Sequence, residues 1–76
     1  MKEMQLNNLN RGQKFKIPGL ENTYRNLKLV RDNDCSAVIA GDRCLTVNGS
    51  KVWSQIPAGY TISPYTVVEP VWLFDN

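Results

Sequence analysis

Short runs of alternating apolar and polar residues, each followed closely by a turn signal, are the feature that most constrains the fold of this chain. The central run is residues 27–47, LKLVRDNDCSAVIAGDRCLTV, in which we expect extended segments to reverse at residues 32–34 (Asp-Asn-Asp) and again at Gly41-Asp42. Asn, Asp and Gly tolerate the positive backbone φ angles that tight turns need. This stretch is therefore predicted to be the central meander of a small all-β domain.

Further strands are predicted on both sides of this meander. Asn48-Gly49 is the strongest hairpin signal in the chain, because this dipeptide suits a two-residue turn. Ser63 can cap a single helical turn in which Pro64 takes the first position. The strands predicted outside the meander are residues 14–17, 51–56, 60–62 and 67–71. Strands this short and this closely spaced favour a small barrel over an open sheet.

The chain has 76 residues, which is enough for one domain. We expect residues 1–12 to be a polar lead-in, residues 13–71 to form the barrel and residues 72–76 to be an apolar tail. A domain of this size buries only about 60% of the surface of its unfolded chain, so it gains stability from a partner. The opening residues lack the apolar run of a signal peptide, and no segment is long enough to span a membrane, so we expect a cytoplasmic location.

The order of the predicted elements resembles that of a known family of folds. An opening GQKF at residues 12–15, a long bent hairpin, a hairpin that bears Trp53, the turn SPYT at 63–66 and the closing strand VVEPV at 67–71 resemble an SH3-like barrel. More narrowly, residues 9–71 resemble small proteins of unknown function from bacteriophages and related mobile elements. The resemblance implies a five-stranded SH3-like barrel with a short helical turn before its last strand, and an interaction protein acting in a bacterial host cell. It supplies no functional residues, and the acidic loop cluster of peptide-binding SH3 domains is missing.

Patterns typical of catalytic and metal-binding sites are not found in the sequence. The chain has no histidine, which is the commonest general base and a common metal ligand. Cys35 and Cys44 alone cannot complete a tetrahedral zinc site, and without CxxC spacing they are expected to be reduced thiols. Asp32 and Asp34 are expected in a solvated turn rather than around a cation. We therefore expect a non-enzymatic protein without a cofactor or a metal.

Aromatic residues in the second half of the chain supply more apolar bulk than so small a barrel can enclose. Some of them are therefore expected at the surface, where an apolar patch marks an interface. The main hypothesis is a binding module that engages a protein partner, or a second copy of itself, through Trp53, Tyr60, Trp72 and Phe74, with Arg31 and Arg43 as polar anchors. A third hypothesis is a small-ligand site built at a dimer interface.

The basic residues favour an alternative hypothesis, nucleic-acid binding. Residues 1–31 carry seven basic and two acidic side chains, whereas residues 32–76 carry two basic and five acidic ones. The cations interleave with Phe15 and Tyr24, and single-strand binding uses rings that stack on bases together with cations that neutralise phosphates. Ordinary solubilising charge over core aromatics explains the same pattern, and a net charge of +2 is low for a dedicated nucleic-acid binder. The site of this alternative is Lys14, Lys16, Arg25 and Lys28.

Overall fold

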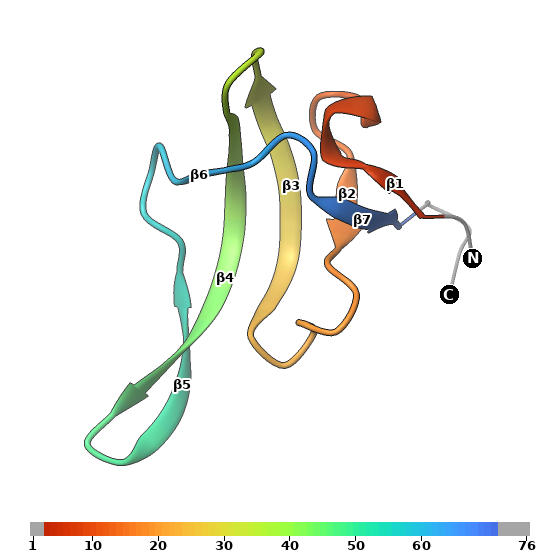
Figure 1. Ribbon diagram of the computed structural model, residues 1–76. Coiled ribbons are helices and arrows are strands. Elements are labelled where there is room, and N and C mark those ends of the chain that lie inside the picture. The colour runs from red at the N-terminus through yellow and green to blue at the C-terminus, as the bar shows by residue number, and fades with distance from the viewer. Residues whose placement is uncertain (1–2, 72–76) are drawn as a thin grey trace.

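Residues 3–71 of the chain are described by the computed structural model (Figure 1). They form an antiparallel sheet with one 3-10 turn, which confirms the predicted all-β class. The elements are β1 (Met4–Gln5), the 3-10 turn η1 (Leu6–Asn8), β2 (Lys14–Lys16), β3 (Tyr24–Asp32), β4 (Ala37–Val47), β5 (Ser50–Gln55), β6 (Thr61–Ile62) and β7 (Val67–Pro70). No helix within residues 3–71 has the length and apolar character that crossing a bilayer requires.

The strands follow the order β1-β7-β2-β3-β4-β5, and β6 pairs with the first residues of β4. β1 and β5 are the two ends of this path, so the sheet is open and the predicted five-stranded barrel is not confirmed. After β6 the chain crosses over β4 and β3 to reach β7, which lies between β1 and β2 (Figure 1). The crossing contains the single turn expected at residues 63–66, closed by a hydrogen bond of 3.1 Å from the Thr66 amide to the Ser63 carbonyl.

Two of the predicted chain reversals are confirmed in detail. Asn33 Oδ1 accepts hydrogen bonds from the backbone amides of Cys35 and Ser36, each at 3.0 Å, so this side chain closes the connection between β3 and β4. Asn48 and Gly49 have positive φ angles of 52° and 82°, as a two-residue hairpin turn of type I′ requires. The local sequence is therefore sufficient to define both turns.

The prediction of another hairpin at Gly41-Asp42 is wrong. β4 continues through both residues and pairs with β3 on one side and β5 on the other. β3 bulges here, with Asn26 at a φ of 57°, so that residues 26 and 27 lie opposite Gly41. A Cβ atom at Gly41 would lie 2.8 Å from Leu27 Cδ2 and 2.9 Å from the carbonyl oxygen of Asn26. The glycine is therefore required by the close approach of the bulged strand and not by a reversal of the chain.

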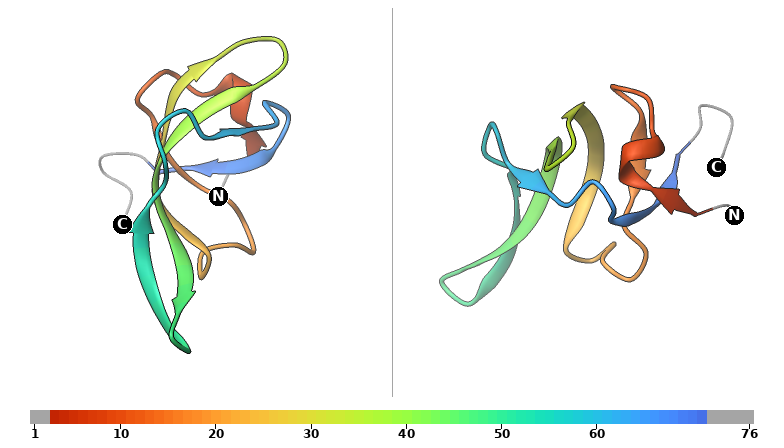
Figure 2. Two further views of the ribbon diagram at one scale, coloured as in Figure 1. Left: turned by 90° about the vertical axis from the view of Figure 1, so that its left-hand side faces the viewer. Right: turned by 45° about the horizontal axis from the view of Figure 1, so that its top comes forward.

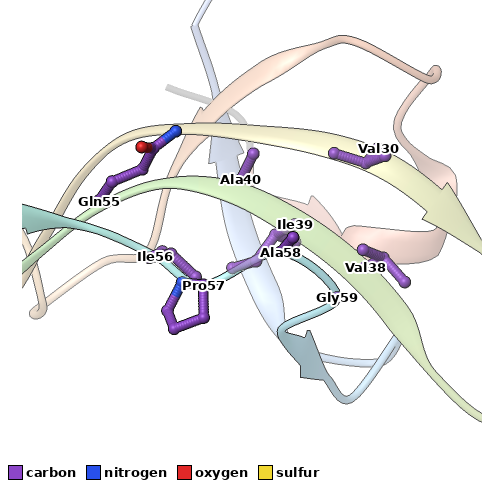
Figure 3. A pocket seen from close by; sticks show the side chains of 9 residues that line it. All are labelled: Val30, Val38, Ile39, Ala40, Gln55, Ile56, Pro57, Ala58 and Gly59. Atoms are coloured by element: carbon purple, nitrogen blue, oxygen red, sulfur yellow. The ribbon is translucent and has the colours of Figure 1, made fainter.

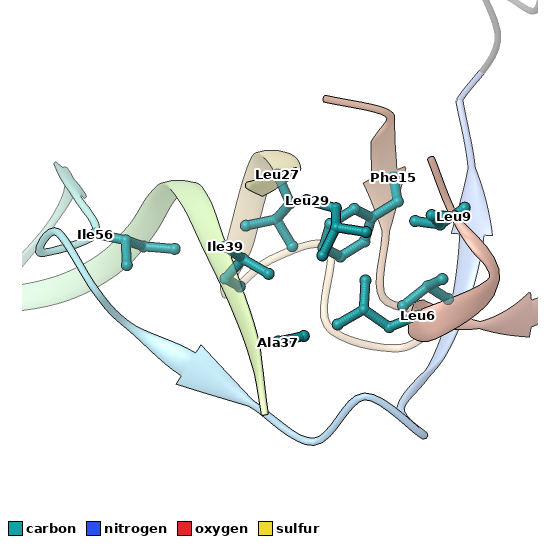
Figure 4. Packing of buried hydrophobic residues seen from close by; sticks show 9 residues of the cluster. Leu6, Leu9, Phe15, Leu27, Leu29, Ala37, Ile39 and Ile56 are labelled. Carbon is teal, nitrogen blue, oxygen red and sulfur yellow. The ribbon is translucent and has the colours of Figure 1, made fainter. Parts of the chain in front are cut away.

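The core lies on one face of the sheet, called the inner face below, and β3 shows how the sequence produces it. Leu27 and Leu29 are buried, whereas Lys28 and Val30 are exposed, as the alternation predicts. The buried cluster (Figure 4) comprises Leu6, Leu9, Phe15, Leu27, Leu29, Ala37, Ile39, Ile56 and Val68. One side of each central strand therefore supplies the core, and the other side faces away from it.

The N-terminal segment belongs to this core. The backbone amide of Leu6 donates to the carbonyl of Thr66, and that of Asn7 donates to the carbonyl of Pro64, both at 2.8 Å. These bonds hold η1 against the crossing segment, and Leu6 and Leu9 are buried. Residues expected as a polar lead-in are thus part of the packed structure.

The hairpin formed by β5 and the second half of β4 extends away from the core. In both Figure 1 and Figure 2 its turn lies far from β1, β2 and β7. Residues 44–53 are called the hairpin arm below. Leu45 and Val52 lie opposite each other on the arm, and both side chains are exposed. The arm therefore presents apolar surface that the core does not cover.

Candidate functional site

The outer face of the sheet, opposite the buried cluster, carries most of the basic residues of β2 and β3. Phe15 points into the core, so Lys14 and Lys16 point outward, as the alternation predicts. Lys28 lies directly opposite Lys14, and opposed residues of an antiparallel pair share a face. Two like charges in this arrangement destabilise the strand pair by up to about 1 kcal/mol. An anion bound between Lys14 and Lys28 would relieve this repulsion.

Arg25 joins the same face further along β3. It lies opposite Asp42, and its Nε is 3.6 Å from Asp42 Oδ2. Asn26 Nδ2 donates a hydrogen bond of 3.0 Å to the same oxygen. Lys16 Nζ lies 3.7 Å from Glu69 Oε1. Solvated ion pairs of this kind contribute little energy and exchange readily with other anions. The outer face therefore brings together all four residues of the nucleic-acid hypothesis: Lys14, Lys16, Arg25 and Lys28.

Three of these cations border a cleft between β2 and β3. The two strands pair at Lys14–Lys28 and at Phe15–Leu27, and the cleft lies beyond these pairs, where β3 bulges. It has a volume of about 260 Å³ and is lined by Lys14, Phe15, Lys16, Glu21, Tyr24, Arg25, Asn26, Leu27 and Val71. Ammonium, guanidinium and amide donors are the groups with which proteins hold phosphate oxygens. These donors suit a phosphate group, and the rest of the lining consists of the Glu21 carboxylate, Tyr24 and the apolar side chains of Phe15, Leu27 and Val71.

Trp53 lies beside this basic surface. It is opposite Cys44 on β4, and its side chain is 36% exposed. The guanidinium carbon of Arg25 lies 4.2 Å from the centroid of the Trp53 ring, which is a cation–π contact. This contact joins β3 to β5 across β4 and holds an exposed ring next to a cation. Such a ring is a platform on which a nucleic-acid base can stack.

An apolar pocket of about 410 Å³ lies where the chain loops out between β5 and β6 along the middle of β4 (Figure 3). Its lining residues are Val30, Val38, Ile39, Ala40, Gln55, Ile56, Pro57, Ala58 and Gly59. Lys28 lies opposite Ala40, and Arg31 lies opposite Val38, so both cations are on the strand next to the pocket, and neither of them lines it. The apolar lining suits a flat, apolar group.

Tyr24, Arg43 and Tyr60 form a polar cluster against the inner face. The hydroxyl oxygens of Tyr24 and Tyr60 are 3.2 Å apart, and the guanidinium carbon of Arg43 is 5.9 Å from the centroid of the Tyr60 ring. The hydrogen bond to Tyr60, aided by partial burial, raises the pKa of Tyr24 above its ordinary value, while Arg43 acts in the opposite direction. Both tyrosines pack against the core, so this cluster stabilises the fold.

The residues of the protein-binding hypothesis are distributed over two faces. Trp53 and Arg31 lie on the outer face, opposite Cys44 and Val38 of β4. Tyr60 and Arg43 contact each other at the inner face, as described above. The structure therefore does not bring these four side chains into one surface.

The tail aromatics of that hypothesis, Trp72 and Phe74, lie outside the described residues, and their roles stay predictions. Sequence reasoning missed Asn26 and Asp42, which contact each other, and Asp42 in turn pairs with Arg25. The tolerance of asparagine for positive φ is the one available signal, and it does not reveal where a strand bulges. Within residues 3–71, no group of three or more His, Cys, Asp or Glu side chains lies close enough together to hold a metal ion.

Comparisons of the chain with protein-family models, with curated proteins and with solved structures found no match.

Proposed function

We propose that this chain is a non-enzymatic module that binds single-stranded nucleic acid on the outer face of its sheet. The observation that carries the proposal is the grouping of Lys14, Lys16, Arg25 and Lys28 on two adjacent strands, three of them around one cleft. Basic residues that are near each other in sequence make a binding surface only where the fold presents them on one face.

Each part of the outer face has a role in this proposal. A backbone phosphate occupies the cleft between β2 and β3, where Lys14 and Lys16 neutralise its charge. A base stacks on Trp53, and the apolar pocket along β4 accepts a neighbouring base. Phe15 takes no part in stacking because it is buried, unlike the role considered for it from the sequence.

Fluorescence anisotropy with a labelled, mixed-sequence DNA single strand tests this function across a series of salt concentrations. We expect the affinity to fall steeply as salt rises, because binding releases counterions from the phosphates. Replacing Lys14→Ala and Lys28→Ala together is expected to weaken binding at low salt. It is also expected to reduce the slope of log affinity against log salt by about 0.7 for each phosphate contact that is lost.

The matched control is Arg11→Ala with Lys51→Ala, which removes the same charge from exposed positions that do not line the cleft. This control is expected to keep most of the affinity and of the salt dependence. Absent binding, binding that salt does not affect, or an equal loss in both double variants would contradict the proposal.

Engagement of a protein partner is a second candidate function. It is supported by the large apolar side chains that the hairpin arm exposes, namely Leu45, Val47, Val52 and Trp53. Apolar side chains gathered on one projecting element are typical of interaction surfaces. If Val52→Ala abolished the binding of a protein partner and left the affinity for nucleic acid unchanged, this candidate would be favoured over the first.

The SH3-like barrel and the similarity to phage proteins are also kept as proposals. The strand order β7-β2-β3-β4-β5 supports the first of them, since the last strand of the described chain returns to lie beside β2. The single turn at residues 63–66, directly before β7, supports it as well.

A further inference from the structure

Within the described part of the chain, the outward edge of β5 has no strand beside it. β5 is the last strand of the sheet path. The amide of Ile56 donates to the carbonyl of Gly41 at 2.8 Å, which shows that the even-numbered residues at this end of the hairpin bond toward β4. Backbone groups alternate in direction along an antiparallel strand. The amides and carbonyls of Lys51, Trp53 and Gln55 therefore point to the free edge.

Apart from one lysine, this edge lacks the features that prevent strands from pairing with other molecules. Natural edge strands are very short, or carry proline, a bulge or several charges. β1, at the other end of the sheet, has only two residues. β5 has six residues with neither proline nor glycine, pairs with β4 without a register shift, and carries one charged side chain, Lys51. It is therefore a competent template for a further strand.

We propose that β5 pairs in antiparallel orientation with β5 of a second copy of this chain, so that two sheets join into one. A pairing with two-fold symmetry places a residue opposite its own copy. Centring it on Lys51 would bring two lysines together, which repel each other. Centring it on Trp53 would place Val52 opposite Ser54 of the partner subunit, an apolar group against a hydroxyl. A register centred on Val52 avoids both the repulsion between the two lysines and the mismatch between valine and serine.

The register centred on Val52 is complementary on both faces. On one face, Val52 meets Val52 of the partner subunit, between the two exposed Leu45 side chains. On the other face, Lys51 meets Trp53 of the partner subunit, which is a favourable cation–aromatic pair. Lys51 and Trp53 carry the edge-pointing backbone groups, so they exchange hydrogen bonds across the new strand pair. This pairing does not depend on nucleic-acid binding.

Disulfide trapping tests the register. Val52→Cys is made in a chain whose own thiols are removed by Cys35→Ser and Cys44→Ser. In an opposed pair without hydrogen bonds the Cα atoms are about 4.5 Å apart, which is within disulfide range. The matched control is Val47→Cys in the same background, because the exposed fractions of Val47 and Val52 are 48% and 41%. Val47 lies on β4 opposite Ser50, so in the dimer its copies are separated by three strand spacings and by four residues along the strands. They are therefore about 20 Å apart, which is beyond disulfide range.

A second variant tests the pairing without cysteine. The amide of Lys51 points to the free edge, so Lys51→Pro removes a donor from the dimer while leaving the hydrogen bonds between β4 and β5. Sedimentation is expected to give a dimer for the wild-type chain and for Lys51→Ala, and a monomer for Lys51→Pro. Circular dichroism checks that the proline variant is folded.

We expect the Val52→Cys chain to form a covalent dimer at least about tenfold faster than the Val47→Cys chain, because only its thiols lie within disulfide range. Equal rates for the two cysteine variants would overturn the proposal. A wild-type chain that sediments as a monomer throughout, or a folded Lys51→Pro chain that remains a dimer, would overturn it as well.

Discussion

Gly41 is held between two strands that approach unusually closely. Its φ is 148°, and a Cβ atom there would lie 3.0 Å from the carbonyl oxygen of Arg25 as well as close to residues 26 and 27. Backbone oxygens cannot move aside as the end of a flexible side chain can. The bulge in β3 and the glycine in β4 therefore depend on each other, and together they set the register that places Arg25 opposite Asp42.

Gly41→Ala is expected to lower the free energy of unfolding by about 2–3 kcal/mol, because the new Cβ meets fixed backbone in a conformation that side chains rarely adopt. Urea unfolding measures this change. Gly59→Ala is the control: Gly59 has a φ of 81°, but nothing lies within 4 Å of its Cβ position. Its cost is expected to be about 1 kcal/mol, from the backbone conformation alone. Equal costs at the two sites would show that the close approach is not a constraint.

The direction of a single side chain can be predicted when its neighbours in the sequence determine it. It cannot be predicted when residues far away in the sequence determine it. Alternation alone predicts that Lys14 and Lys16 point outward, because each lies next to the buried Phe15. The opposition of Lys14 and Lys28 depends on the register between β2 and β3, which no local signal specifies. The Gly41-Asp42 pair has the same composition as a hairpin turn, and only the bulged neighbouring strand distinguishes the two structures.

Among the elements, the N-terminal segment differs most from its expected role. Asn7, Asn8 and Asn10 make it polar overall, and this composition indicated a lead-in rather than a part of the core. Leu6 and Leu9, three residues apart, are nevertheless buried, because η1 turns both toward β7 and the crossing segment. A single turn around residues 4–9 can be predicted from the sequence, and η1 lies there. Two leucines are too few to give a recognisable periodicity, so their burial in the core could not be predicted.

Leu6→Ala is expected to lower the free energy of unfolding by about 3 kcal/mol, since it leaves a cavity in a small core. That is a large share of the stability of a domain of this size. Leu20→Ala is the matched control, because Leu20 is 41% exposed whereas Leu6 is 0% exposed. Its cost is expected to stay below about 0.5 kcal/mol. Chemical denaturation of both variants decides whether the segment is part of the folded unit, and a small loss at Leu6 would show that it is not.

At the scale of the whole molecule, charge is distributed unevenly along the sequence, and the arrangement of the strands makes it uneven over the surface as well. The basic first half of the chain contains β2 and β3, and these strands are neighbours, so their outward residues gather on one face. A closed barrel was predicted from strand number and spacing, which do not determine whether the last edges meet. The long hairpin arm extends past the core and ends the sheet at β5 instead.

Joining two copies through β5 would extend the basic surface, because opposed residues of an antiparallel pair share a face and the two outer faces then lie on the same side of one sheet. A single strand of DNA that is long enough to reach both clefts is held at two linked sites, which raises its affinity without new contacts.

We therefore expect an oligonucleotide that spans both copies to bind at least about tenfold more tightly than one of half its length. In Lys51→Pro this gain is expected to disappear while the affinity for the shorter strand stays unchanged, since that variant keeps its cleft. Anisotropy titrations of both lengths with the wild-type chain, Lys51→Pro and Lys51→Ala measure the effect. A gain that persists in the proline variant would mean that some other contact joins the two basic faces, and a dimer without any gain would mean that DNA does not follow the outer face across β5.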